Sequence, residues 1–73
     1  MKMVKVFKTN IEDYGVALHI MLLLEGIFTQ SRINFDLDDC DRVLRVESRQ
    51  EPIGETEIQL LVTRWGYSCE PLS

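Results

Sequence analysis

Residues 13–28 of the chain, DYGVALHIMLLLEGIF, form its longest periodic apolar run and decide the predicted fold. Apolar side chains recur here every three or four residues, the spacing that places them on one face of an α-helix. The face expected to pack on a sheet holds Tyr14, Ala17, Ile20, Met21 and Leu24. Gly26 suits the end of a helix, where a left-handed backbone conformation is needed. The run therefore predicts a helix packed on a sheet.

The residues just before this run favour a helix start. Thr9 and Asn10 have side chains that can accept hydrogen bonds from the free N–H groups of a first turn. Glu12 and Asp13 are expected to lie in that first turn, because the helix dipole favours negative charge there. We therefore expect the helix to begin close to Asn10.

The opposite side of the predicted helix is also apolar. Leu18, Leu22 and Leu23 flank His19 there, where a surface helix would normally be polar. We expect another chain to cover this side, although single exposed leucines are common and need no partner. His19 has no partner residue that spacing would supply, so we expect it at the edge of an interface rather than in a metal site or a pH switch.

The remaining elements alternate around this helix. Strands are predicted at residues 3–8, 32–37, 43–46 and 67–69, and a second helix at residues 55–65. In the first strand, Val4 and Val6 are expected to face the core and Lys5 the solvent. The order strand, helix, strand, strand, helix, strand predicts one domain over residues 1–73, an α+β ferredoxin-like βαββαβ sandwich. It would hold a four-stranded antiparallel sheet with two helices on one face.

Composition excludes several classes of function. Net charge is −4 with twelve acidic and eight basic residues, so a basic surface for nucleic acid is not expected. No segment is apolar for long enough to span a bilayer, and the first residues do not resemble a signal peptide. Two cysteines in a small domain, Cys40 and Cys69, indicate a reducing compartment, so a cytoplasmic location is expected. The single histidine lacks a nucleophile at a suggestive spacing, so we expect neither an enzyme nor a cofactor.

Three short segments carry a family resemblance. They are Leu24-Glu25-Gly26-Ile27 at the end of the first helix, the hairpin of Phe35-Asp36-Leu37 with Val43-Leu44-Arg45-Val46, and Trp65-Gly66-Tyr67 before the last strand. In these the chain resembles the heavy-metal-associated domains of copper chaperones and metal-transporting ATPases. The resemblance implies a ferredoxin-like fold and a metal site, made of two thiolates in the loop before the first helix.

The metal positions implied by that resemblance hold no thiol in this chain. They fall on Asn10 and Asp13, and an amide with a carboxylate cannot replace the thiolates that select reduced copper. Glu12, Asp39 and Cys40 are weaker candidates, because the first loop and the hairpin turn meet at one end of this fold. Aspartates also favour turns and helix starts without any ion. We expect no thiolate metal site here.

These observations predict a non-catalytic interaction module. Self-association as a homodimer, or binding of a partner protein, is expected through Leu18, His19, Leu22 and Leu23. Two alternatives stay open: binding or delivery of a heavy-metal ion through the degenerate site, and a regulatory domain that binds a small ligand, which rests on fold analogy.

Overall fold

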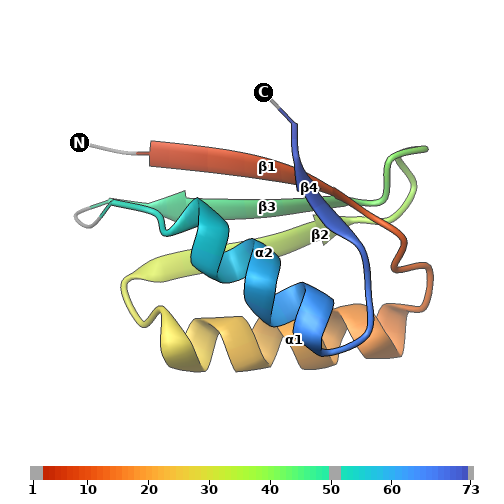
Figure 1. Cartoon of the computed structure of the whole chain (residues 1–73), viewed down its shortest axis with the longest axis horizontal. Helices are drawn as coiled ribbons and strands as arrows, with labels where there is room; N and C mark the ends of the chain where they lie inside the picture. Colours follow the sequence, from red (N-terminus) through yellow and green to blue (C-terminus); the bar gives the residue numbers. More distant parts are fainter. Residues whose placement is uncertain (1–2, 50–51, 73) are drawn as a thin grey trace.

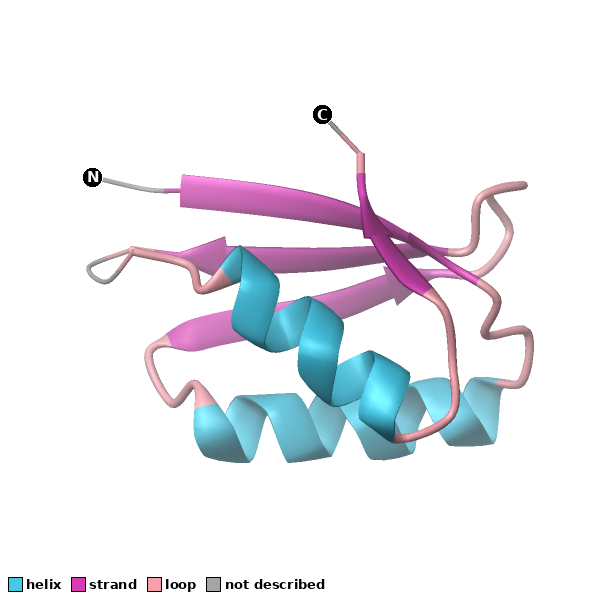
Figure 2. Cartoon of the chain, viewed as in Figure 1, coloured by secondary structure: helices cyan, strands magenta, loops and turns pink. Residues whose placement is uncertain are grey.

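The computed structural model describes residues 3–49 and 52–72 of the 73-residue chain. In chain order the elements are β1 (Met3–Thr9), α1 (Tyr14–Ile27), β2 (Ser31–Asp36), β3 (Val43–Ser48), α2 (Glu55–Arg64) and β4 (Cys69–Pro71) (Figures 1 and 2). The four strands form one sheet in the order β2-β3-β1-β4, with every pairing antiparallel. The predicted element order and the α+β ferredoxin-like arrangement are confirmed.

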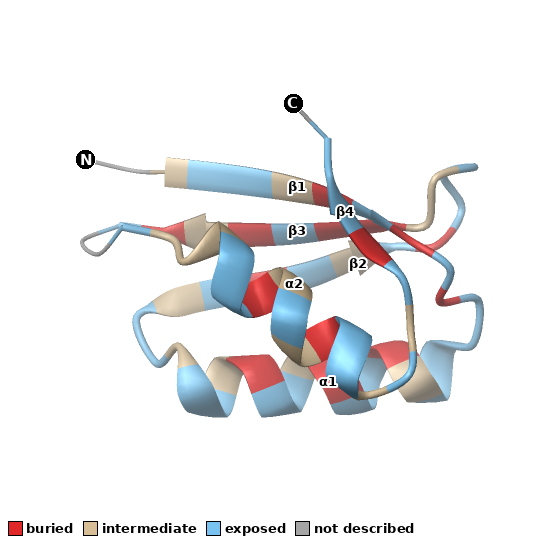
Figure 3. Ribbon diagram, in the orientation of Figure 1, coloured by how far each residue is buried: buried red, intermediate tan, exposed pale blue. Residues whose placement is uncertain are grey.

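A single hydrophobic core joins both helices to one face of the sheet (Figure 3). From the strands it takes Phe7, Ile33, Leu44, Val46 and Cys69, and from the helices it takes Ala17, Ile20, Leu24, Ile58 and Val62. Phe7, Leu24 and Leu44 are fully buried. Alternate strand residues point to the other face, which neither helix covers. Of the α1 face expected against the sheet, Ala17, Ile20 and Leu24 are buried and Met21 is half-buried.

The buried face of β1 differs from the one expected. Phe7 and Thr9 are buried, whereas Val4 is 44% exposed and Val6 is half-buried on the opposite side. The run Val6-Phe7 interrupts the alternation, and the larger Phe7 fills the space between sheet and helices. Lys5 consequently lies on the helix side at the rim, where its Nζ is 3.5 Å from Glu55 Oε2.

The start of α1 also differs from the expected one. Asp13 is the N-cap, and neither acid lies in the first turn. Thr9 does not cap the helix; its hydroxyl donates to the carbonyl oxygen of Arg42 at 2.6 Å. Ile11 is 1% exposed, so its side chain is held in the core and the chain up to Asp13 stays non-helical. Tyr14, expected on the sheet side, is 70% exposed at the new helix start.

The last strand begins later than predicted, at Cys69 rather than Tyr67. The backbone N–H of Tyr67 donates to the carbonyl oxygen of Val62 at 3.3 Å. This N–H group therefore bonds to the last turn of α2 and not to a neighbouring strand. Gly66 makes this possible with φ = 102°, a left-handed conformation that favours glycine. The turn at Gly66 places Trp65 and Tyr67 close to α1.

Candidate functional site

The outer face of α1, formed by Leu18, His19, Leu22 and Leu23, lies on the surface. Leu18 is 52% exposed, Leu22 is 59% exposed and Leu23 is 37% exposed. His19 is exposed as well. The structure thus places all four predicted interface residues on the exposed surface of α1.

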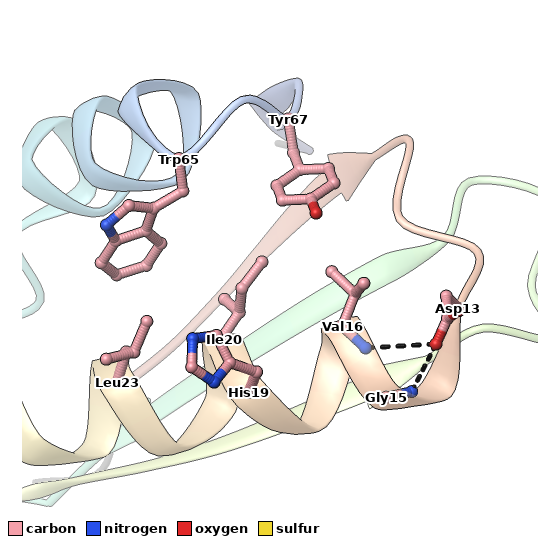
Figure 4. Close-up of a pocket in the computed structure, with 8 residues that line it drawn as sticks. All are labelled: Asp13, Gly15, Val16, His19, Ile20, Leu23, Trp65 and Tyr67. Atoms are coloured by element: carbon pink, nitrogen blue, oxygen red, sulfur yellow. Dashed lines mark hydrogen bonds between the residues drawn. The ribbon is translucent and has the colours of Figure 1, made fainter.

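A groove lies between α1 and the segment that follows α2, and we call it the α2-side groove. Its volume is about 520 Å³. The residues that line it are Asp13, Gly15, Val16, His19, Ile20, Leu23, Trp65 and Tyr67 (Figure 4). Trp65 and Tyr67 project from the end of α2 toward α1, with Ile20 and Leu23 facing them (Figure 4). His19 and Leu23 therefore belong both to the outer face of α1 and to this groove.

A second groove lies between α1 and the edge strand β2, and we call it the β2-side groove. It has a volume of about 210 Å³ and is lined by Tyr14, Ala17, Leu18, Met21, Asn34 and Phe35. Leu18 is shared between this groove and the outer face of α1. The outer face thus has an apolar groove on each side, which the sequence pattern alone does not reveal.

The first-loop residues Asn10 and Asp13 have structural roles. The Oδ1 atom of Asn10 accepts a hydrogen bond from the backbone N–H of Ser68 at 2.9 Å. The Oδ1 atom of Asp13 accepts from the N–H groups of Gly15 at 2.6 Å and Val16 at 3.2 Å, which caps α1. Both side chains therefore satisfy backbone donors of the loop and of the first helical turn.

The central hairpin turn gathers acidic groups beside the first loop. The ligand atoms of Asp39, Cys40 and Asp41 lie within 4.8 Å of one another, and this grouping does not extend to Glu12 or Asp13 in the part of the chain described. Two positive groups neutralise this end of the molecule in part. Lys8 Nζ is 3.9 Å from Asp41 Oδ1, and a second ion pair of 3.5 Å joins the guanidinium of Arg42 to Glu12. The carboxylates thus serve the turn and its ion pairs.

The two cysteines have different environments. Cys40 is exposed in the hairpin turn, and Cys69 is 3% exposed in the core. Burial raises the pKa of Cys69 from 9.0 to about 11, and the neighbouring charge of Glu70 adds to the effect. At neutral pH Cys69 is therefore a protonated core thiol, consistent with the role of a small buried hydrophobe.

Within residues 3–49 and 52–72 no helix is both long and apolar enough to cross a bilayer. Comparison of the chain with protein-family models, with curated proteins and with solved structures found no match in any of the three. The surfaces described above are accordingly the basis for a functional proposal.

Proposed function

We propose that this protein is a non-catalytic association module that binds a second protein chain, in the first place another copy of itself, through the outer face of α1. The observation that carries the proposal is the adjacent exposure of Leu18, Leu22 and Leu23 on a helix whose inner side is already in the core. Full burial of a leucine side chain stabilises by about 1.5–3 kcal/mol, so covering several neighbours favours association.

The positions of the three leucines on the helix indicate one continuous surface rather than three unrelated exposed side chains. Leu18 and Leu22 are four residues apart, so they lie next to each other on one stripe, and Leu23 widens it toward the α2-side groove. Contiguous apolar surface beside concave apolar surface is typical of protein interaction sites. Free Cys40 and Cys69 agree with a reducing location, and we propose the cytoplasm.

Sedimentation over a range of protein concentrations tests the association. We expect concentration-dependent dimerisation that Leu22→Glu abolishes, because a buried unpaired carboxylate is strongly unfavourable. Leu60→Glu is the matched control, since Leu60 lies on α2 and is 63% exposed. A strict monomer at high concentration, with Leu22→Glu leaving stability unchanged, would remove self-association from the proposal.

We also propose that the chain is a thiol-free relative of the heavy-metal-associated domains. The order of elements and the Gly66 turn between α2 and β4 support this relation. Asn10 and Asp13 have the spacing of the family's two cysteines, so the double variant Asn10→Cys, Asp13→Cys should gain a soft-metal site. We expect one copper(I) ion per chain in a competition titration, with Asn10→Cys alone as control. No gain of binding would contradict the relation and leave the association proposal intact.

A second candidate function is binding of a small ligand in the α2-side groove. The groove volume of about 520 Å³ lies in the usual range of ligand sites, about 300–1,000 Å³. Trp65, Tyr67 and Asp13 are among the residues that line it (Figure 4). Aromatic faces and a carboxylate attract a positive charge, while Val16, Ile20 and Leu23 favour an apolar body. The groove therefore suits a small amphipathic amine.

The fluorescence of Trp65 tests the second candidate, because it is the one tryptophan of the chain. We expect phenethylamine to change the emission in a saturable way and to raise the unfolding temperature by mass action. Phenylpropionate, which has a similar ring but a carboxylate, is the matched control and should have a much smaller effect. Equal responses to both compounds, or none at millimolar concentration, would contradict the candidate.

A further inference from the structure

The edge strand β2 has a charge pattern that is complementary to its own copy. Arg32, Asn34 and Asp36 alternate on the open face of the sheet, and all three are exposed. Ile33 and Phe35 point to the other face, where they join the core or pack against it. One end of the strand is therefore positive on the open face and the other end negative.

The backbone of β2 determines which of its residues can pair with a further strand. The N–H of Ser31 donates to the carbonyl oxygen of Phe28 at 2.9 Å, and the N–H of Ile33 donates to Glu25 Oε2 at 3.3 Å. Both donors thus point away from β3. In an antiparallel strand the backbone N–H and C=O groups of successive residues point alternately to one side and the other, so those of Phe35 also point away from β3. The odd-numbered residues of β2 form the pairing edge.

We propose that two copies of the chain pair antiparallel through β2, with Asn34 on the twofold axis. Ile33 of each copy then exchanges backbone hydrogen bonds with Phe35 of the other. Arg32 of each copy faces Asp36 of the other across the open face, which places two opposite-charge pairs in the dimer. This inference rests on the proposed self-association and specifies its geometry.

Charge selects this register among those that the backbone permits. A twofold axis at Ile33 would place Arg32 opposite Asn34 and leave Asp36 beyond the paired residues. An axis at Phe35 would place Asn34 opposite Asp36 and Arg32 opposite Asp38, which is outside β2. The axis at Asn34 alone gives Arg32 an acidic partner within the strand, and it gives that pair twice.

The same pairing covers the part of the outer face of α1 that lies toward β2. Helix α1 lies alongside β2, at the edge of the sheet away from β4 (Figure 1). A twofold axis through Asn34 and normal to the sheet therefore brings the α1 helices of both copies next to each other. Leu18 and Met21, which line the β2-side groove, and the neighbouring Leu22 would then be shielded by the second copy. The edge of the sheet and the apolar helix face become one continuous interface.

Glu25 competes with this pairing. Its Oε2 atom accepts the hydrogen bond from Ile33 N–H, the donor that Phe35 of the second copy would engage. Dimerisation replaces one acceptor by another, and the Glu25 carboxylate must turn away. We therefore expect Glu25→Ala to tighten the dimer, whereas loss of an ordinary interface contact would weaken it.

A charge-exchange experiment tests the register by sedimentation. Arg32→Glu and Asp36→Arg should each raise the dimer dissociation constant at least about tenfold, because like charges then face each other twice. An equimolar mixture of the two variants should recover tight association, since each copy supplies the charge that the other needs. Arg64→Glu, which makes the same charge change in the last turn of α2, is the control and should have no effect.

A cross-link gives a second measurement that does not depend on charge. Residues facing each other on the axis of a non-hydrogen-bonded antiparallel pair have Cα atoms about 4.5 Å apart, within the range of a disulfide. In a Cys40→Ser background, Asn34→Cys should form a covalent dimer on mild oxidation. Arg32→Cys in the same background should do so far less, because Arg32 faces Asp36 of the second copy.

The outcomes separate this inference from the proposal on which it rests. If Leu22→Glu breaks the dimer while the charge variants, their mixture and Asn34→Cys behave like controls, association through α1 stands and the β2 register is wrong. If the chain is monomeric at every concentration, both are overturned. Recovery in the mixture cannot arise from misfolded variants, so it supports the register directly.

Discussion

The side-chain oxygen of Asn10 accepts a hydrogen bond from the backbone N–H of Ser68 at 2.9 Å, and so joins the loop before α1 to the loop before β4. These loops are 58 residues apart in the chain. The next pairing along the sheet is between Thr9 and Cys69, at the end of β1. Asn10 therefore extends the contact between β1 and β4 past the last backbone pair.

Replacing Asn10 by alanine should lower the free energy of unfolding by about 0.5–1.5 kcal/mol, the usual net value of a hydrogen bond. The change removes the acceptor for the Ser68 N–H. Urea unfolding at low protein concentration measures this loss. Asn10→Asp keeps an acceptor oxygen and should retain most of the stability, so equal losses in both variants would show that the bond to Ser68 contributes nothing.

The two sides of α1 should respond differently to truncation. Leu24 is fully buried, so Leu24→Ala should cost about 2–5 kcal/mol through lost burial and the cavity left behind. Leu22 is 59% exposed, so Leu22→Ala should change the stability of the monomer by no more than about 0.5 kcal/mol. Denaturant unfolding at low protein concentration compares them. A large loss for Leu22→Ala in the monomer would mean that its side chain supports the fold.

Stability should fall at alkaline pH because of Cys69. Burial raises its pKa from 9.0 to about 11, so the unfolded chain releases this proton first as pH increases. The contribution is complete below pH 9 and is lost between pH 9 and about 11, by roughly 2–3 kcal/mol at 1.36 kcal/mol per unit. Unfolding curves across this range measure it. Cys69→Ala removes this thiol and is the control, so a wild-type stability that falls no more steeply with pH than that of the variant would contradict the assignment.

Divalent ions and copper should bind only weakly at the hairpin turn. Asp39 Oδ1 already accepts from the backbone N–H of Asp41 at 2.9 Å, and Lys8 supplies a positive charge 3.9 Å from the Asp41 carboxylate. We expect titration with zinc and copper to give no dissociation constant below about 1 mM, which corresponds to a binding free energy of roughly 4 kcal/mol. Micromolar binding that Asp39→Asn abolishes would establish a site at this turn.

The sequence predicts the element order and much of the α1 core because periodicity is a local property. Ala17, Ile20 and Leu24 follow the helical repeat and are buried as expected. Tyr14 follows the same repeat, yet its exposure depends on where the helix begins. That start is set by the buried Ile11, whose environment comes from distant parts of the chain. Local patterns cannot supply such long-range information.

The grooves and the edge of the sheet could not be predicted for the same reason. Trp65 and Tyr67 face α1 because of the turn at Gly66, and no residue spacing indicates which element they would meet. The hydrogen bond from Ile33 to Glu25 likewise appears only when the end of α1 is placed beside β2. The residues of the outer face were identifiable, but not the concave surfaces that flank them.

The two outer strands of the sheet are unequal, and this limits how the molecule can grow. β4 spans only Cys69–Pro71, and proline has no N–H to offer an incoming strand. β2 is therefore the edge of the sheet at which a further strand can be added. Pairing between two copies through β2 would occupy this edge in both molecules. The proposed dimer would therefore stop at two molecules and would not extend into a fibre.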